Sequence, residues 1–359
     1  MVGDDWPGSD TSKPEPGRLR VRRRWLVVGI LALVLAYPAW NAMSLWLTWR
    51  NVERAELDTV AFEELPPVAA SADHELPEGA AAAFTPAPVE ESPTADPGLG
   101  PTGGGAEFDT YMIVGSDLGG SRADVILLVL LPRHDAAPIM VSLPRDLYLP
   151  NRCTQGLTRL NANYNGCGDD INGATLLSGA VRDFTGLEVD HFALFAMEDF
   201  AVIIDRIGGT EICVEYPVRD GNGLQLPAGC TLADGETTLL WVRSRTTQEL
   251  VDGRWRTMPG VSDLTRNQRQ QDLILSMLSR ASEFDSPAAL TGFVQSLGDT
   301  FVLDDGLGMR EAVDLAWTHR DLRPDDFERL TIPVQPHETT AGAQVLLPTA
   351  SFSEVLAGR

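Results

Sequence analysis

The feature that most constrains this chain is an uncharged run of 23 residues near its start. Residues 25–47 read WLVVGILALVLAYPAWNAMSLWL and contain no Asp, Glu, Lys or Arg. A helix needs about 20 mainly apolar residues to cross the hydrocarbon core of a bilayer. A cleavable signal peptide has a shorter apolar region that ends in small residues, and a buried hairpin of a soluble protein lacks a basic start and an aromatic end. The sequence therefore predicts an uncleaved transmembrane helix at residues 25–47.

A short basic head precedes this run. Residues 1–24 contain six Lys or Arg residues against four acidic ones, whereas the whole chain has a formal net charge of -23. Because positive charge is retained on the cytoplasmic side, residues 1–24 are predicted to be cytoplasmic. The residues after 50 are then extracytoplasmic, on the outer side of the cell membrane, and the predicted helix is the part that contacts the lipid bilayer. A chain this acidic is not expected to bind nucleic acid, which requires a basic surface.

The four cysteines form two local pairs that suit an oxidising compartment. Cys153 and Cys167 flank a loop rich in Asn and Gly, and Cys213 and Cys230 flank a loop with turn-forming residues at 220–223. We predict one disulfide in each pair, contributing on the order of 3 kcal/mol for a loop of about 15 to 18 residues. The alternative, one zinc ion bound by all four cysteines, lacks the short spacing of such sites.

After the hydrophobic run, residues 48–106 fill with Ala, Pro, Glu and Gly and lose hydrophobic periodicity. They contain too few large apolar residues to build a core, so we predict a disordered linker. The triple glycine at 103–105 is not a phosphate-binding loop, because no strand precedes it and no Gly-Lys-Ser/Thr follows it. The linker would tether a folded domain to the membrane.

The remaining residues, 107–359, have the pattern of a single α/β domain of about 250 residues. Short apolar runs between polar residues indicate buried strands, and longer amphipathic stretches indicate helices. Strands are expected at residues 109–115, 125–131, 138–143, 191–196, 211–214, 330–334 and 344–347. Helices are expected at residues 173–185, 197–207, 263–282, 288–297 and 309–318.

Five arginines and two aspartates are the candidate site residues of this domain: Arg122, Arg145, Arg243, Arg245, Arg269, Asp117 and Asp124. A guanidinium presents a rigid fork of donors that matches phosphate oxygens, and paired carboxylates suit a hard divalent cation. Most of these residues fall at the ends of expected elements, where ligand-binding groups of α/β sheets often lie. Together they predict a pyrophosphate site, and ordinary surface ion pairs are the alternative.

Several ordered strings within residues 107–359 are similar to those of a known family. They are GSD followed by SRAD, SLPRDLYLP, LTRLNANYNGCG, DHFALFAMEDFAVIIDRIGG, LLWVRSRTT and DLTRNQRQQ. The domain resembles the LytR-CpsA-Psr family of bacterial envelope proteins, and the basic head, anchor and variable linker resemble its topology. The resemblance implies one domain with a central mixed β-sheet flanked by helices.

The resemblance further implies a phosphotransferase that moves a glycan polymer from a polyprenyl-pyrophosphate carrier onto peptidoglycan, forming a phosphodiester. By similarity, Asp117 and Asp124 hold Mg2+ or Mn2+. The arginines implied in catalysis and pyrophosphate binding are Arg122, Arg145, Arg243 and Arg245, with binding assisted by Arg159, Arg266, Arg269 and Gln270. Asp263 is a catalytic candidate that orients an arginine or accepts a proton from the acceptor hydroxyl.

Two positions depart from the family pattern. The family commonly has Arg-Ser/Thr-Asp-Thr where this chain has Arg122, Ala123, Asp124 and Val125, and Arg159 stands where a lysine is common. Two alternative functions remain open. A polyprenyl-pyrophosphate phosphatase would use the same residues with water in place of the acceptor, and the lost hydroxyls favour a non-catalytic lipid-binding regulatory protein of the envelope. Neither the polymer nor the acceptor is specified by the sequence.

Overall fold

The computed structural model describes residues 43, 46–47, 49–68, 108–116, 122–134, 136–259, 269, 271–273, 300–308, 311–312, 315, 318–319 and 321–358. The chain divides into two compact units, residues 1–47 and residues 48–359. The basic head and nearly all of the predicted transmembrane helix therefore lie outside the described residues. Within the described part of the chain, no helix is both long and apolar enough to cross a membrane.

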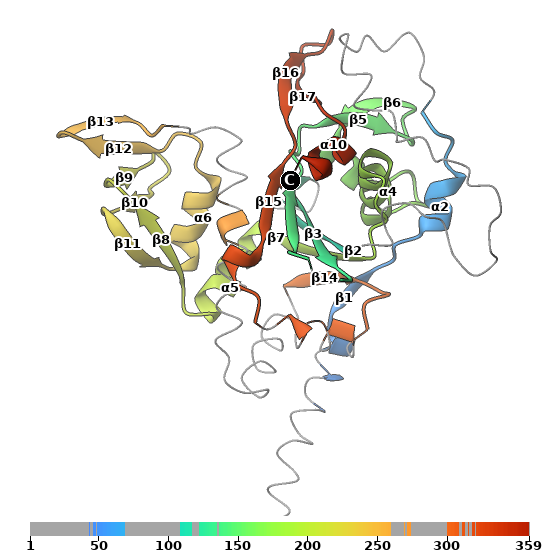
Figure 1. Cartoon of the computed structure of the whole chain (residues 1–359), viewed down its shortest axis with the longest axis horizontal. Helices are drawn as coiled ribbons and strands as arrows, with labels where there is room; N and C mark the ends of the chain where they lie inside the picture. Colours follow the sequence, from blue (N-terminus) through green and yellow to red (C-terminus); the bar gives the residue numbers. More distant parts are fainter. Residues whose placement is uncertain are drawn as a thin grey trace, which may run out of the picture. The chain divides into compact units, whose positions relative to one another are not determined.

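A seven-stranded mixed β-sheet forms the centre of the second unit (Figure 1). In spatial order its strands are β1 (Glu53–Ala55), β14 (Phe301–Asp304), β7 (His191–Ala196), β2 (Phe108–Ser116), β3 (Ala123–Pro132), β4 (Ile139–Ser142) and β15 (Glu328–Thr331). β3 is antiparallel to both β2 and β4, whereas β7 runs parallel to β2 and β15 runs parallel to β4. The predicted α/β domain with a mixed sheet is confirmed.

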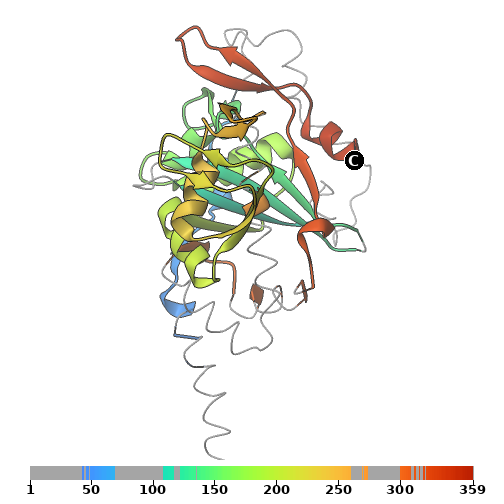
Figure 2. The ribbon, with the colours of Figure 1, turned by 90° about the vertical axis from the view of Figure 1, so that its left-hand side faces the viewer.

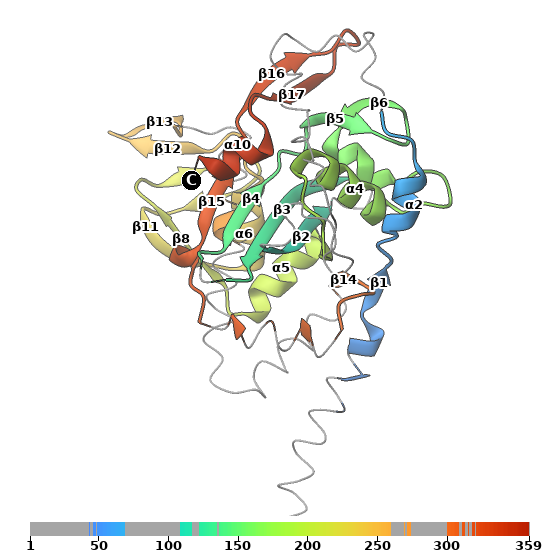
Figure 3. The same ribbon diagram turned by 45° about the vertical axis from the view of Figure 1, so that its right-hand side comes forward.

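Helices cover both faces of this sheet, which explains why its central strands are almost wholly apolar. On one face, α4 (Gly173–Thr185) and α10 (Phe352–Ala357) pack on alternate β3 residues, including Ile126 and Leu128. On the other face, α5 (Met197–Arg206) and α6 (Gly235–Arg243) pack on Val125 and Leu127. Figure 3 shows α4 and α5 on different sides of the sheet. Side chains of β3 thus contribute to two separate cores.

Smaller elements surround this three-layer centre. The strands are β5 (Tyr148–Asn151), β6 (Gly156–Arg159), β8 (Thr210–Val214), β9 (Val218–Arg219), β10 (Gln225–Leu226), β11 (Gly229–Ala233), β12 (Gln248–Val251), β13 (Arg254–Thr257), β16 (Val334–Glu338) and β17 (Gln344–Pro348). Further helices with described bounds are α2 (Thr59–Glu64), η2 (Leu160–Asn165) and η3 (Pro324–Asp326). Four of the strands form a second sheet in the order β10-β9-β12-β13. Figure 2 shows the β16–β17 hairpin continuing from β15.

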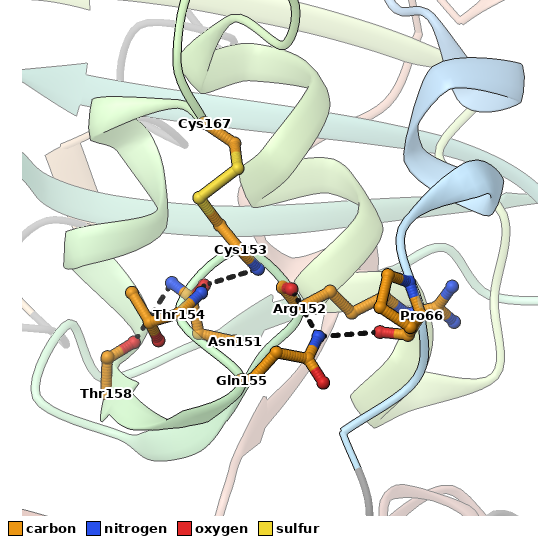
Figure 4. Close-up of a disulfide and its surroundings, with 8 residues drawn as sticks. All are labelled: Pro66, Asn151, Arg152, Cys153, Thr154, Gln155, Thr158 and Cys167. Atoms are coloured by element: carbon orange, nitrogen blue, oxygen red, sulfur yellow. Dashed lines mark hydrogen bonds between the residues drawn. A yellow bond between two sulfur atoms is a disulfide. The ribbon is translucent and has the colours of Figure 1, made fainter.

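Both predicted disulfides are present. Cys153 bonds to Cys167, and Cys213 bonds to Cys230, a directly paired position of strands β8 and β11. Beside the first bridge, the Asn151 side chain accepts hydrogen bonds from the backbone N–H groups of Cys153 and Thr154 at 2.9 and 3.0 Å (Figure 4). Side-chain capping of this turn reinforces the covalent closure of its loop.

The predicted linker over residues 48–106 is wrong at its beginning. Residues 53–55 form β1, which pairs in parallel with β14, and residues 59–64 form α2. Asp58 caps α2 by accepting a hydrogen bond from the Ala61 N–H at 2.8 Å. The compact unit therefore begins before β1 and not at residue 107. Composition averaged over about 60 residues concealed one short strand and one short helix within this segment.

Phe62 anchors α2 to the domain. Its side chain is 2% exposed and packs with Ile171 and Leu176. A Cβ atom added at Gly179 of α4 would lie 2.2 Å from the Phe62 ring, so this close approach requires glycine. The guanidinium carbons of Arg152 and Arg182 lie 4.5 and 5.1 Å from the ring centroid. The ring is thus held by apolar contacts and by two cation–π contacts.

Most predicted elements are confirmed within a residue or two, and one strand is corrected. The strand expected at 330–334 is two elements, the end of β15 and the start of β16, with Pro333 between them. Proline lacks the N–H that a continuing ladder needs, which ends β15 before it. The helix expected at 288–297 lies outside the described residues. Those at 263–282 and 309–318 are described at a few positions, which are helical.

A buried carboxylate fastens β14 to β7. Asp304 is 2% exposed and accepts hydrogen bonds from the backbone N–H groups of Phe192 and Leu307 at 3.0 and 2.8 Å. It also lies 3.2 Å from Nδ1 of His191, whose Nε2 is 3.3 Å from Glu311. The hydrogen bond to Asp304 raises the pKa of His191 above its ordinary value, although burial opposes this. Burial disfavours ionisation of Asp304, but the His191 and backbone hydrogen bonds outweigh it and lower its pKa.

These shifts predict a pH dependence of stability. Because the folded-state pKa of His191 is raised, its contribution is complete below the unfolded value of about 6.5 and is lost as the pH rises through the folded pKa. The Asp304 contribution is present above the unfolded value and is lost as the pH falls through its lowered folded pKa. We expect His191→Gln to lower Tm by about 2–4 °C more at pH 5.5 than at pH 8.5. His134→Gln, an exposed position, is the control, and equal losses at both pH values would contradict this role.

Candidate active site

Four strand ends meet at one edge of the main sheet. Ser116, the last residue of β2, pairs with Ala123 at the start of β3 and with Ala196 at the end of β7. Ser142, the last residue of β4, pairs with Leu127 of β3. This register brings Arg122, Asp124 and Arg145, each predicted from the sequence, to the same edge. Asp117 directly follows β2 but lies outside the described residues.

Arg145 is the centre of this edge. Its Nη1 atom pairs with Asp124 Oδ1, and its Nε atom lies 3.4 Å from Asp146 Oδ2. The Arg145 side chain is 20% exposed. Burial disfavours its charge, but the hydrogen bond to Asp124 and the two nearby carboxylates outweigh it and raise its pKa. A charged guanidinium is therefore held in place at the sheet edge by two carboxylates.

Asp146 joins Arg145 to Arg159, and its role was not predicted from the sequence. Arg159 Nε lies 3.4 Å from Asp146 Oδ1. Arg159 also donates through Nε and Nη2 to the Gln344 carbonyl at 3.1 and 2.7 Å. The predicted site residue Arg159 is thus fixed by β17 as well as by Asp146. The available signal was the PRD string, in which Asp146 follows Arg145 directly.

The two positions that depart from the family pattern point into the domain. Ala123 is fully buried in the cluster under α4, and Val125, 3% exposed, lies in the cluster under α5. Asp124, between them, has a half-buried side chain. The two lost hydroxyls therefore belonged to buried positions, where an unpaired hydroxyl would have a cost. Arg122 and Asp124 themselves remain at the edge.

A second group of arginines gathers at the end of α6. The helix begins with Asp234, which accepts the Thr237 N–H at 2.8 Å. Gly235 lies so close to α5 that an added Cβ would be 2.0 Å from the Ala201 carbonyl oxygen. Arg243 occupies the last turn, where the helix dipole favours a cation, and Arg245 follows two residues later. Both arginine side chains are exposed.

A hydrogen-bond network holds the segment that carries Arg243 and Arg245. The carboxylate of Asp220 accepts from the hydroxyls of Ser244 and Thr246, the latter at 2.6 Å. The Ser244 hydroxyl also lies 2.6 Å from that of Thr247. Partial burial opposes ionisation of Asp220, but these hydrogen bonds outweigh it and lower its pKa. The sequence indicated a turn at Asp220. It did not reveal that the Asp220 carboxylate supports residues 243–247, called the arginine segment below.

Arg269 lies beneath the same segment and is 8% exposed. Its Nη1 atom donates to the Trp241 carbonyl at 3.2 Å and to the Thr247 hydroxyl at 3.1 Å, and its guanidinium lies 3.8 Å from the Trp241 ring centroid. Burial lowers the pKa of Arg269 to about 10, which leaves it charged at neutral pH. Arg269 is therefore placed to position the arginine segment, and its direct contact with pyrophosphate stays a prediction.

The two arginine groups border the same hydrophobic cluster. Val125, next to Asp124, and Val242, next to Arg243, are both buried in the cluster around α5. Three predicted site residues, Asp263, Arg266 and Gln270, lie outside the described residues, as Asp117 does. Their placement beside either group stays a prediction.

Metal-ligating side chains gather closely at one place among the described residues, Glu211, Cys213 and Cys230. The two cysteines are bonded to each other, so their sulfur atoms are not available as thiolate ligands. The predicted ligand pair of Asp117 and Asp124 is described only at Asp124.

Comparison with known proteins identifies the relatives of this domain. The profile of the LytR_cpsA_psr family matches residues 109–356. The probable cell wall biosynthesis protein LcpB of Corynebacterium glutamicum is 33% identical over 177 residues, which cover 49% of this chain and 37% of that protein. LcpA of the same organism is 25% identical over 69% of this chain and 50% of its own length. The chain thus spans half or less of these two curated relatives.

Solved structures of related proteins have the same fold. The LytR-Csp2A-Psr enzyme from Actinomyces oris superposes with a TM-score of 0.57 at 29% identity, covering 70% of this chain and 89% of that one. Bacillus subtilis TagV, at 18% identity, shares the fold with a TM-score of 0.55, over 67% of this chain and 91% of its own. Residues 109–356, which the family profile matches, contain Arg122, Arg145, Arg243 and Arg245 and both disulfides. The chain belongs to the LytR-CpsA-Psr family.

Proposed function

We propose that this protein is a membrane-anchored phosphotransferase that moves a glycan from a polyprenyl-pyrophosphate carrier to a peptidoglycan hydroxyl. Related Bacillus subtilis TagT, 23% identical over 204 residues, is described as a polyisoprenyl-teichoic acid–peptidoglycan teichoic acid transferase. The observation that carries the proposal is the Arg145 guanidinium, held between Asp124 and Asp146 at the sheet edge. Guanidinium groups at such a position neutralise charge on phosphate oxygens.

The proposed reaction exchanges one P–O bond for another. The acceptor hydroxyl oxygen attacks the phosphorus that carries the glycan, and the bond from that phosphorus to the lipid phosphate breaks. The products are a glycan phosphodiester on peptidoglycan and a polyprenyl phosphate, and the hydroxyl proton passes to a base, for which Asp263 is the candidate. Because phosphoryl transfer depends mainly on positioning and charge neutralisation, a nucleophilic Ser or Cys is not needed.

The carboxylate oxygens at the sheet edge are suitable ligands for a divalent cation. The half-exposed carboxylate of Asp124 offers oxygen ligands, and Asp117 directly follows β2, whose last residue pairs with the residue before Asp124. We propose that these two aspartates hold Mg2+ or Mn2+. When bound, such an ion would offset the negative charge of the pyrophosphate. Arg122 and Arg145 would orient the phosphates from the same edge, and Arg243 and Arg245 would bind them from the segment after α6.

The burial of Ala123 and Val125 supports an active enzyme. The altered positions lie inside the two cores, so the departure from the family pattern removes no exposed group from the edge. This weakens the main reason for a non-catalytic binding protein.

The test is turnover by the full chain in detergent, with a short polyprenyl-pyrophosphate disaccharide as donor and peptidoglycan as acceptor. We expect transfer in the presence of Mg2+ and a loss of about 100-fold or more after chelation with EDTA. Release of lipid phosphate at the same rate without acceptor would indicate a phosphatase instead. Tight binding of the donor without any turnover would contradict both enzymatic functions.

A further inference from the structure

The four-stranded sheet β10-β9-β12-β13 has one buried face and one exposed face. Side chains at paired positions of an antiparallel sheet point to the same face and alternate along each strand. Val218 and Leu226 are therefore on the buried face, where they join the cluster with Ile212 and Val214. The opposite face, called the Trp255 face below, carries Arg219, Gln225, Gln248, Leu250, Trp255 and Thr257.

Trp255 is the central feature of this face. Its side chain is among the few exposed large hydrophobic ones of the described residues, at 37%. The Arg219 guanidinium lies 4.1 Å from the Trp255 ring centroid and donates through Nε to Gln248 Oε1 at 3.0 Å. The arginine thus spans the sheet from β9 and fixes the orientation of the indole on β13. A fixed, exposed aromatic ring binds a ligand at a low cost in conformational entropy.

The polar groups around the ring define the ligand chemistry. Two amides, one hydroxyl and one guanidinium share this face with Trp255, and none of the strand residues of the face, all of them described, is acidic. This contrasts with the formal net charge of -23 of the chain. An indole offers an apolar surface to the C–H groups of a sugar ring, and amides and guanidinium groups bind hydroxyl oxygens. The combination suits a glycan.

The Trp255 face is continuous with the arginine segment of the candidate active site. Arg219 is followed directly by Asp220, whose carboxylate holds Ser244 and Thr246. Gln248, at the start of β12, follows Arg245 by three residues. The strands that carry Arg219 and Gln248 are thus joined directly to the segment that carries Arg243 and Arg245.

We infer that the Trp255 face binds the sugars of the donor glycan next to the pyrophosphate. The inference rests on the proposed function. The donor is the ligand of this face because the adjoining segment carries the pyrophosphate arginines, Arg243 and Arg245. Specificity for the polymer then depends on residues of β9, β10, β12 and β13 and not on the arginines that bind the phosphates.

The test measures the affinity that the sugars add. The full chain in detergent is titrated calorimetrically with geranyl pyrophosphate and with geranyl pyrophosphate that carries an N-acetylglucosaminyl disaccharide. We expect Trp255→Ala to weaken binding of the sugar-bearing ligand about tenfold and to leave geranyl pyrophosphate within about twofold. Trp255→Phe, which keeps an aromatic ring, should lose less. Arg254→Ala, on the same strand and the opposite face, is the matched control and should change neither affinity.

Each contrary result has a separate meaning. If Trp255→Ala weakens both ligands equally or neither, the inference is overturned while the pyrophosphate site stands. If the variant loses binding of a soluble muropeptide and keeps the donor, the face serves the acceptor and the inference is likewise overturned. If the wild type binds neither pyrophosphate, the proposed function itself fails. Thermal unfolding of each variant verifies that the sheet remains folded.

Discussion

Replacing Arg145 with alanine is expected to reduce glycan transfer by about 10²–10³-fold, the usual effect of removing one group that stabilises transition-state charge. The guanidinium is already fixed between Asp124 and Asp146, so it needs little reorganisation to meet a pyrophosphate. Arg145→Lys keeps the charge but loses the planar fork of donors and should recover only part of the rate. The measurement is kcat and KM for the disaccharide donor in the presence of Mg2+.

Arg133→Ala is the matched control. Arg133 also follows a strand of the same sheet, but its exposed guanidinium pairs with the exposed carboxylate of Asp109 at 2.8 Å. An ion pair of this kind contributes little to stability, and nothing places it at the candidate site. Activity should be unchanged in this variant. Equal activity of Arg145→Ala and the wild type, with both proteins folded, would remove the sheet edge from the mechanism.

Replacing Phe62 with alanine is expected to destabilise the domain by about 3–5 kcal/mol, the range for truncating a buried aromatic side chain. The ring fills the space above Gly179 and contacts two arginines, so its loss leaves a cavity between α2 and α4. Urea unfolding measures the change. Val60→Ala, on the same helix but 69% exposed, should alter the free energy of unfolding by less than about 0.5 kcal/mol.

A double-mutant cycle sharpens this prediction. Gly179→Ala alone should be destabilising, because the added methyl group meets the Phe62 ring. In the Phe62→Ala background the same substitution has space and should cost much less, so the two changes are coupled. Additive effects would show that α2 does not dock on Gly179. They would then restore the view of residues 48–68 as part of a flexible linker.

Features that depend on neighbouring residues could be predicted from the sequence. Apolar runs located β2, β3 and β4, and the spacing of the cysteines gave both disulfides. The site arginines at strand ends could also be found, because guanidinium and carboxylate groups beside an apolar strand have a limited number of uses. Arg122, Asp124 and Arg145 do share one sheet edge.

What the sequence did not reveal depends on contacts between distant residues. Residues 53–55 have no strong strand pattern and become a strand because β14, about 250 positions later, provides a partner. The Gly and Asn residues next to Asp220 indicate only a turn, and its hydroxyl partners lie more than 20 residues away. Arg269 has the same charge as the exposed arginines, and only burial distinguishes its role.

If residues 25–47 span the bilayer, the early position of β1 limits the distance between the domain and the membrane. Five residues separate Leu47, the end of the predicted transmembrane helix, from Glu53, the start of β1. Even fully extended, five or six residues reach roughly 20 Å. In that case the sheet stays within about that distance of the bilayer, which holds the prenyl chain of the carrier. The long Ala- and Pro-rich segment is then an insertion between α2 and β2, and its length does not change this maximum distance.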